Sequence, residues 1–484
     1  MRVVIVGNGP ASASAIEAFR KVDKDSDIIV LSDEEFPTYA PNCMENVIRG
    51  DISEEALFYK GGFSFYEKYK VDFRPRKEVV GIDNKRKVVM VKGGEEIAYD
   101  KCLLAAGAYA FVPPIPGVEL GGVTTAKNLY DAKRIREWVL SGRVKSVVIV
   151  GAGPIGIEDA ETLRHMGLEV HVVEFFDRVL PRMLDKFMAD KYMKPLEEEG
   201  INFYLNHQVV AIHGEDGWVE AVEIRPNGTD KSKFIRADMV ILSTGVRPRT
   251  NIVADTDIKL HINEATGRVV GGILVNQYQQ TSDPDVYAAG DICSGIDAWG
   301  NHRWIALFPP AQQSGAIAGY NMAGLKVKNP GLVDYNALKT RSATAGSGGV
   351  FEEAEESFSF EWNGKLVKVF LKEGSVCGYQ FVGVGKGRAL NPRNRFLRNE
   401  RIKSWAEKII LDKGLGLEAS GVLFHYFIRF KERKIEGYPS LCVRIVYLYG
   451  LSVHGPYNIV WPVGRSAGHV LGRTKDAMHL HLWL

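Results

Sequence analysis

The chain has 484 residues, which is enough for about three domains of ordinary size. Hydrophobic residues make up 45% of it and charged residues 25%, as in globular proteins with a sizeable core. The 61 basic and 59 acidic residues leave a net charge of +2, so neither nucleic acid nor an anionic membrane is an expected partner. No apolar run approaches the roughly 18 residues that a membrane span needs, and no leader precedes the first strand, so we expect a cytoplasmic protein.

The five cysteines are few and scattered. No two of them form a CxxC or CxxxxC pair, which argues against a disulfide framework, a paired-thiol centre and a zinc site. We therefore expect no metal, and any thiol chemistry would use a single cysteine. The cysteines are Cys43, Cys102, Cys293, Cys377 and Cys442.

A glycine turn follows the first predicted strand. Residues 2–6 (RVVIV) predict a buried strand, residues 7–12 (GNGPAS) a tight turn, and a helix is expected from Ala11 towards Arg20. A second strand is expected at 28–31. Such a βαβ unit brings a dinucleotide pyrophosphate to the N-terminus of its helix, although a glycine turn alone also opens many ordinary helices. The residues expected to bind the cofactor here are Gly7, Gly9, Pro10, Ala11, Ser12 in place of a third glycine, and Asp33, because Ser32 stands where the acidic residue usually falls.

The same pattern returns in a more complete form. A strand at 147–150 precedes residues 151–156 (GAGPIG), and the next strand, 170–173, ends in Glu174. A carboxylate at that position accepts a hydrogen bond from a ribose 2′-hydroxyl and repels a 2′-phosphate, so NADH is expected to be preferred over NADPH. Arg178, four residues further on, is a cation that would soften this preference. The expected binding residues are Gly151, Gly153, Ile155, Gly156, Glu158 and Glu174.

Three further segments end in glycine turns. Residues 99–108 lead through Ala106 and Gly107 into a proline-rich crossing, and residues 241–248 turn at Gly245. Residues 281–291 predict a strand that ends at Gly290 and Asp291. A carboxylate there can accept a hydrogen bond from a flavin ribityl hydroxyl, and the alternative is an aspartate that caps a helix.

With these segments in order, the chain resembles the FAD-dependent pyridine nucleotide–disulfide oxidoreductase superfamily from residue 1 to about 385. The resemblance implies an α/β fold with two Rossmann-like domains that bind FAD and NAD(P)H, followed by an α+β interface domain. It places the FAD domain at 1–112 and 242–325, the NAD(P) domain at 113–241, and the interface or dimerisation domain at 330–415. It also implies that Gly7, Gly9 and Asp291 hold FAD, that Gly151, Gly153, Gly156 and Glu174 hold the nicotinamide dinucleotide, and that Glu158 lies near the nicotinamide–flavin contact.

Residues 38–50 (TYAPNCMENVIRG) are similar to the single-cysteine branch, which comprises NADH oxidases, NADH peroxidases and coenzyme A-disulfide reductases. Gly50 comes seven residues after Cys43, which is the spacing of this branch. Asn42 before the cysteine is more similar to the coenzyme A-disulfide reductases than to the other members. A thiol at a helix N-terminus feels the positive end of the dipole, which favours the reactive thiolate. Cys43 is therefore the expected catalytic residue, with packing as a small apolar side chain as the alternative.

One observation limits the resemblance. Oxidases and peroxidases of this branch carry a histidine in the first glycine turn, where this chain has Pro10, so histidine-assisted peroxide reduction is in doubt. Cys102, Cys293, Cys377 and Cys442 are expected only to pack.

The expected function is that of an FAD-dependent oxidoreductase, similar to NADH oxidases and coenzyme A-disulfide reductases. Electrons would pass from NADH through FAD to Cys43 and on to a small disulfide, a persulfide or O₂. One alternative is an NAD(P)H reductase of an electron carrier of the rubredoxin or ferredoxin type, with Cys43 merely packed. Another is a non-catalytic redox sensor that binds FAD and NADH. A homodimer is expected if the C-terminal domain is intact.

The end of the chain departs from the resemblance. Alternating residues between 365 and 383 predict paired strands of the interface domain. Residues 420–484 show no clear period, and His479 and His481 are interpreted as part of an apolar tail rather than a metal tract. The atypical tail, 416–484, is either a lineage extension or the product of a shifted reading frame.

Overall fold

The described part of the chain divides into two units. The computed structural model describes residues 1–297, 300–362, 365–372, 375–384, 426–434 and 442–450. The larger unit comprises Met1–Leu371 and Cys377–Arg398, and the smaller comprises Lys372–Val376 and Asn399–Leu484. The larger unit is mixed α/β and contains two parallel sheets, which confirms the predicted fold class.

The first parallel sheet draws its strands from two distant stretches of sequence. Its strand order is β20–β7–β1–β2–β3, with β1 at the centre. All but the first residue of β1 and of β2 are buried, as is typical of parallel strands covered on both faces. The strands are β1 (Arg2–Val6), β2 (Asp27–Leu31), β3 (Val71–Arg74), β7 (Lys101–Leu104) and β20 (Val286–Ala288).

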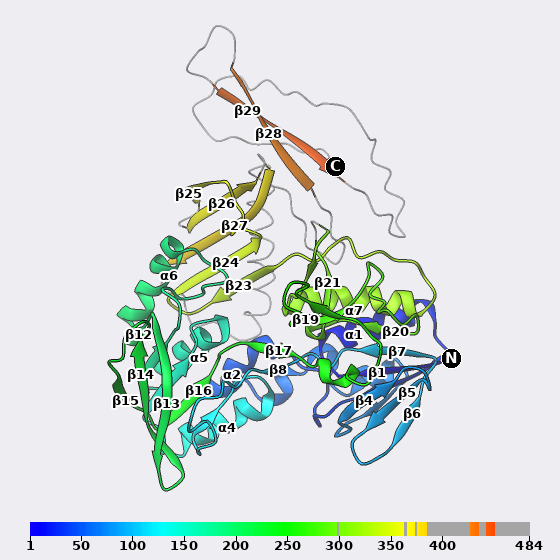
Figure 1. The fold of residues 1–484 in the computed structure, drawn as a ribbon, viewed down its shortest axis with the longest axis horizontal. Coiled ribbons are helices and arrows are strands. Elements are labelled where there is room, and N and C mark those ends of the chain that lie inside the picture. Colours follow the sequence, from blue (N-terminus) through cyan, green and yellow to red (C-terminus); the bar gives the residue numbers. More distant parts are fainter. Residues whose placement is uncertain (298–299, 363–364, 373–374, 385–425, 435–441, 451–484) are drawn as a thin grey trace. The chain divides into compact units, whose positions relative to one another are not determined.

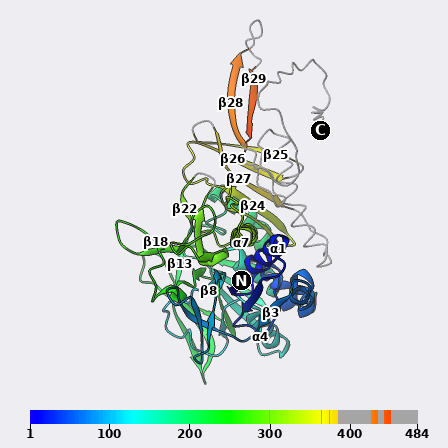
Figure 2. The same ribbon diagram turned by 90° about the vertical axis from the view of Figure 1, so that its right-hand side faces the viewer.

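Two helices pack tightly beside this sheet. α1 (Pro10–Val22) and α7 (Phe308–Met322) lie together in both views (Figures 1 and 2). A Cβ atom on Gly315 would lie 2.1 Å from the carbonyl oxygen of Ala11, and one on Gly319 would lie 2.2 Å from that of Ala15. Only glycine permits this close approach, which fixes the helix that follows the first glycine turn. α1 extends one residue before and two beyond the predicted 11–20.

The second parallel sheet has the order β12–β11–β10–β16–β9. Every residue of β10 is buried. Helices α4 and α6 begin at side-chain caps, since Asn128 accepts from the Asp131 N–H and Asp185 accepts from the Met188 N–H. The elements are β9 (Val123–Thr124), α4 (Leu129–Leu140), β10 (Ser146–Val150), α5 (Pro154–His165), β11 (Glu169–Val173), α6 (Lys186–Glu198), β12 (Ile201–Tyr204) and β16 (Met239–Leu242).

Smaller sheets surround the two parallel ones. One has the order β4–β5–β6, with β4 (Val79–Asp83), β5 (Val88–Val91) and β6 (Glu96–Ala98). Another is β13 (His207–Glu215), β14 (Trp218–Pro226) and β15 (Lys233–Arg236). A third has the order β18 (Leu260–Ile262), β19 (Val269–Leu274), β21 (Cys293–Ile296) and β22 (His302–Arg303). β8 (Ala108–Ala110) pairs with β17 (Val246–Pro248), and the short helices are α2 (Met44–Arg49) and α3 (Ser64–Lys68).

A further sheet follows in sequence and appears in yellow in Figure 1. β26 and β27 are neighbours in it, which confirms the paired strands predicted between 365 and 383. Its order is β23 (Tyr335–Lys339), β24 (Ala343–Gly349), β27 (Ser375–Val384), β26 (Lys365–Lys372) and β25 (Glu356–Trp362).

The smaller unit contains an antiparallel hairpin of β28 (Tyr426–Lys434) and β29 (Cys442–Gly450). Residues 420–484 show no clear period in sequence, yet they contain these two strands. Aromatic and aliphatic residues fall at consecutive positions here, among basic ones, so no single face stands out in the sequence. The other residues of 416–484, with His479 and His481, and residues 385–415 of the predicted 330–415 domain lie outside the described residues.

Among the described residues, no helix is both long and apolar enough to cross a membrane.

Candidate functional site

The first glycine turn opens onto a pocket of about 780 Å³ at the head of the first parallel sheet. Gly7 has φ +101°, and a Cβ there would lie 2.3 Å from the carbonyl oxygen of Ala105, so only glycine fits. A Cβ on Gly9 would meet nothing within 4 Å, which leaves room for a ligand against the backbone. The pocket is lined by these sequence-predicted residues among others: Gly7, Gly9, Pro10, Ala11, Asp33, Ala106, Gly107, Gly290 and Asp291.

Ser12 does not line the pocket but completes the turn. Its hydroxyl donates to the carbonyl oxygen of Gly7 at 2.8 Å. At the corresponding position of the second turn, a Cβ on Gly156 would lie 2.1 Å from the carbonyl oxygen of Gly151. The first turn therefore carries a side-chain hydrogen bond to its own carbonyl oxygen, which the glycine of the second turn cannot form.

Two aspartates of the pocket meet cations that the sequence did not single out. Asp33 is exposed, and its Oδ2 accepts from Nη1 of Arg249 at 2.8 Å. Lys127 Nζ lies 3.9 Å from Asp291 Oδ2. Burial raises the pKa of Asp291 and Lys127 opposes that shift, so hydroxyl donors from a ligand would favour the charged form. Arg249 could have been predicted as a pocket residue because it directly follows the Gly245 turn segment. No sequence pattern indicated Lys127.

Tyr39 and Glu34, which the sequence did not single out either, also line the pocket. The Tyr39 hydroxyl donates to Oε1 of Glu34 at 3.3 Å. Burial raises the pKa of Glu34, although the hydrogen bond from Tyr39 opposes that shift, and burial together with the charge of Glu34 raises the pKa of Tyr39. The pocket wall therefore contains a hydrogen-bonded pair of a phenol and a carboxyl group.

The second glycine turn repeats the geometry of the first at the head of the second parallel sheet. Gly151 has φ +108°, and a Cβ there would lie 2.5 Å from the carbonyl oxygen of Ser243. Gly153, like Gly9, has open space where a side chain would stand. Ile155 is exposed on the first turn of α5, and Glu158, further along, is half-buried. This is a second cradle in which backbone N–H groups and a helix N-terminus are available to a pyrophosphate.

Glu174 is held against the second turn. Its Oε2 accepts from the Ala152 N–H at 2.7 Å and its Oε1 from the Phe176 N–H at 2.9 Å, and the residue is 6% exposed. The carboxylate is therefore fixed at the strand end, where a ribose would lie. Arg178 does not soften its effect in this conformation, because the guanidinium binds Asp177 and the carbonyl oxygens of Pro181 and Leu184.

Gly245 lies two residues after Ser243, whose carbonyl oxygen lies against Gly151 of the second turn. It has φ +97°, and its carbonyl oxygen accepts from the Phe111 N–H at 2.9 Å. It lies between β16 of the second parallel sheet and β17 and does not line the pocket of the first turn, and its role in cofactor binding stays a prediction.

Cys43 caps the short helix α2. It ends a 3-10 turn, Pro41–Cys43, and is the N-cap of α2, which ends at Gly50 with φ +84° as the spacing predicted. Pro41 lines the pocket of the first turn, whereas Cys43 is not among its lining residues. α2 packs against α5, the helix of the second cradle. The cysteine is thus two residues from one cradle, on a helix that contacts the helix of the other.

The remaining described cysteines are buried. Cys102, Cys293 and Cys377 are at most 8% exposed, and Cys43 is the only cysteine with a described side chain that is not buried. Burial raises the pKa of Cys293 to about 12 and that of Cys102 further still, so both stay as thiols. The side chain of Cys442 lies outside the description. The packing role of the three buried cysteines is in line with expectation.

Asp159, next to Glu158 on α5, is a buried carboxyl group without a hydrogen bond at Oδ2. The residue is 3% exposed. Burial, reinforced by the charges of Glu45 and Asp131, holds its pKa well above the ordinary value. Its neutral form is therefore favoured on α5, the helix against which α2 packs.

Asp159→Asn is expected to flatten the dependence of stability on pH. Because the folded pKa lies above the unfolded one, this carboxyl group contributes fully only below the unfolded pKa of about 3.9, and its contribution is lost as the pH rises through the folded pKa. Thermal unfolding of both proteins at about pH 5 and about pH 8 measures this. If the wild type and Asp159→Asn lose the same stability between about pH 5 and about pH 8, the prediction is wrong. Asp131→Asn, which weakens bonds from Thr125 and Arg134, should destabilise at both values.

Two glycine cradles on parallel sheets, with a carboxylate fixed at the strand end of one, define the class of two-dinucleotide oxidoreductases. A family model described as pyridine nucleotide-disulphide oxidoreductase matches residues 1–315. The chain belongs to this family. It is an NAD(P)H-dependent oxidoreductase with FAD as its cofactor.

Three relatives illustrate the similarity. The chain is 35% identical to an NADH oxidase of Methanocaldococcus jannaschii, over 68% of this chain and 71% of that protein. It is 32% identical to a CoA-dependent NAD(P)H sulfur oxidoreductase of Pyrococcus abyssi, over 82% of this chain and 85% of that protein. Among solved structures, an NAD-dependent persulfide reductase from A. fulgidus superposes with a TM-score of 0.71 at 29% identity, covering 82% of this chain and 76% of that one.

Proposed function

We propose that the protein is an NADH-dependent reductase of a small disulfide or persulfide that works through Cys43, with O₂ as a secondary acceptor. The observation that carries this proposal is the position of Cys43. It is partly exposed, lies two residues after the pocket residue Pro41 in the chain, and caps a helix packed on the helix of the second cradle.

In this proposal the two cradles divide the cofactors between them. The pocket of the first turn holds FAD, with Asp291 and Asp33 as acceptors for ligand hydroxyls, and residues 1–112 and 242–325 form the FAD domain. The second turn holds the nicotinamide dinucleotide, with residues 113–241 as its domain and Glu174 selecting NADH. The volume of the pocket and the open space at Gly9 fit a bound dinucleotide. Bound FAD supplies two-electron chemistry between NADH and the thiol.

Cys43 supplies the sulfur chemistry. Its thiolate attacks one sulfur of the substrate S–S bond, forms a mixed disulfide and releases the other sulfur as a thiol. Two electrons that derive from NADH, together with a proton, then reduce this mixed disulfide. This step restores Cys43 and releases the second sulfur product. The net reaction for a disulfide is NADH + H⁺ + RSSR → NAD⁺ + 2 RSH. For a persulfide the products are a thiol and H₂S.

The relatives support a sulfur acceptor of this kind. The Pyrococcus abyssi protein is named for CoA-dependent sulfur reduction and the A. fulgidus structure for persulfide reduction. A coenzyme A disulfide or persulfide is therefore the proposed substrate class. Proline at position 10, where oxidases and peroxidases of the branch have a histidine, fits this choice. Cleavage of an S–S bond depends less on that histidine than peroxide reduction does. The sheet β23–β27 is the proposed dimerisation surface of a homodimer.

An acceptor comparison tests the proposed function. NADH oxidation by FAD-loaded protein is measured anaerobically with coenzyme A disulfide, coenzyme A persulfide or rubredoxin as the acceptor. The sulfur acceptors should support turnover that Cys43→Ser removes. Rapid rubredoxin reduction that survives in Cys43→Ser, with neither sulfur compound reduced, would overturn the proposal in favour of a carrier reductase.

A further inference from the structure

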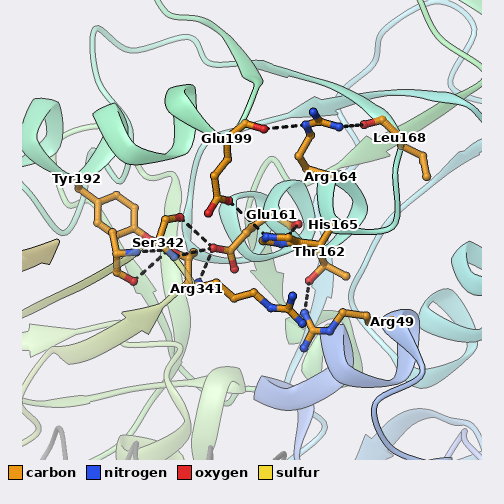
Figure 3. A network of polar contacts seen from close by, with 12 residues as sticks. Arg49, Glu161, Thr162, Arg164, His165, Leu168, Tyr192, Glu199, Arg341 and Ser342 are labelled. Atoms are coloured by element: carbon orange, nitrogen blue, oxygen red, sulfur yellow. Dashed lines mark hydrogen bonds and ion pairs between the residues drawn. The ribbon is translucent and has the colours of Figure 1, made fainter. Parts of the chain in front are cut away.

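Three potential ligand groups converge away from both cradles, where α5 and α6 end. Glu161 and His165 lie one turn apart on α5, and Glu199 directly follows α6 (Figure 3). One ligand atom from each of the three lies within 4.8 Å of the others. No part of the proposed electron transfer uses them.

The imidazole of His165 is oriented by its other nitrogen. Nδ1 lies 2.8 Å from the carbonyl oxygen of Glu161, which can only accept, so Nδ1 carries the proton. The lone pair of Nε2 therefore points away from this bond, and Nε2 lies 3.6 Å from Oε2 of Glu199. A histidine whose second nitrogen donates to a carbonyl is the arrangement that metal-bound histidines usually show.

Each of the two carboxylates has one oxygen without a described hydrogen-bond donor. Glu161 is 1% exposed, and its Oε1 accepts from the N–H groups of Arg341 and Ser342 and from the Ser342 hydroxyl, whereas no described residue donates to Oε2. Oε2 of Glu199 is a buried atom with no hydrogen-bond partner. Within the described part of the chain, neither carboxylate forms an ion pair with a lysine or arginine. A buried carboxylate without a counter-charge is costly, and a bound cation would remove that cost.

We propose that Glu161, His165 and Glu199 bind a divalent transition-metal ion, with Zn²⁺ as the representative. An imidazole is a ligand of borderline hardness and the two carboxylates are hard ligands, and this mixed set suits Zn²⁺ or Mn²⁺ better than Ca²⁺. Zinc binds such ligands at about 2.0–2.2 Å, so the three side chains must draw together by roughly an ångström. His165 and Glu199 have side chains that are 25% and 30% exposed, which leaves room for this movement and for a water ligand.

The ion would join the ends of two helices to a strand turn. Glu161 already fixes the turn between β23 and β24 through Arg341 and Ser342. A metal bound to the same carboxylate would link α5, α6 and this turn. The site is therefore structural, and it does not depend on the proposed function. The spacing of Glu161 and His165 on one helix face was visible in the sequence, but nothing there placed Glu199 beside them.

Zinc titration of the full-length, FAD-loaded protein after chelator treatment tests the site. Isothermal calorimetry should show one more equivalent of Zn²⁺ for the wild type than for His165→Gln or Glu199→Gln, or an affinity at least about tenfold higher, since even outer-shell partners of a ligand contribute about 10- to 100-fold. His213→Gln is the matched control, because His213 pairs with Glu223 at 3.1 Å without a second carboxylate. Histidines of the C-terminal tail are the same in all four proteins.

Thermal unfolding and X-ray absorption give independent readouts. Zn²⁺ should raise the unfolding midpoint of the wild type and of His213→Gln, but not that of His165→Gln. At substoichiometric zinc, the absorption spectrum of the wild type should show one imidazole, further oxygen neighbours and no sulfur. Unchanged binding in both Glu199→Gln and His165→Gln, or sulfur around the zinc, would overturn the proposal. The absorption spectrum is measured on the wild type alone, so it tests the proposal even if a variant fails to fold.

Discussion

Cys43→Ser is expected to lower the reduction of coenzyme A disulfide or persulfide by about a thousandfold or more, as is typical when the nucleophile of a covalent mechanism is removed. The hydroxyl of serine is neither acidic enough nor nucleophilic enough to open an S–S bond. FAD binding and the first reduction of the flavin by NADH should persist, because Cys43 is not among the residues that line the pocket. Stopped-flow and steady-state rates with the same enzyme separate the two steps.

Cys377→Ser is the control for this prediction. Cys377 is 8% exposed in β27, far along the chain from both glycine turns, so this variant should keep disulfide reduction. Equal sulfur turnover by Cys43→Ser and the wild type would show that the cysteine only packs. Loss of flavin from Cys43→Ser would show instead that the residue supports the fold of the pocket.

Glu174→Gln is expected to change the choice of nicotinamide cofactor. Hydrogen bonds to a charged acceptor contribute about 1.5–3 kcal/mol, so kcat/KM for NADH should fall by about 10- to 150-fold. The rate with NADPH should rise relative to that with NADH, because the amide no longer repels a 2′-phosphate. Glutamine keeps an acceptor oxygen for the Ala152 N–H, which limits damage to the turn.

Steady-state kinetics with both cofactors measure this change. Glu169→Gln is the matched control, because Glu169 begins the same strand but has an exposed side chain paired only with His171. It should leave the ratio of the two cofactors unchanged. If Glu174→Gln also leaves the ratio unchanged, then Glu174 serves only to brace the turn and cofactor choice lies elsewhere.

The chemistry of glycine made both turns predictable from sequence. A positive φ and a Cβ collision at Gly7 and Gly151 allow no other residue there, so the pattern carries a direct steric signal. The strands next to these turns were equally predictable, because parallel strands covered on both faces consist of uninterrupted apolar residues. The end of α2 at Gly50 followed from the same conformational rule.

Contacts between distant residues could not be predicted in this way. Lys127 approaches Asp291, and Arg249 binds Asp33, only because separate stretches of chain meet at the pocket. The guanidinium of Arg178 is taken up by nearby carbonyl oxygens, which depends on a local loop conformation that composition does not reveal. The roles of the individual site residues and the domain limits stay predictions, and the variants above address Cys43 and Glu174.

Anaerobic titration of the FAD-loaded protein with NADH tests the central claim most directly, namely that two dinucleotide sites in one chain exchange electrons. The flavin absorbance should bleach, and complete reduction of enzyme whose Cys43 is held as a mixed disulfide should take about two equivalents of NADH per FAD, one for the flavin and one for that disulfide, but only about one in Cys43→Ser. A protein that binds no FAD, or whose bound FAD stays oxidised in excess NADH, would contradict the account.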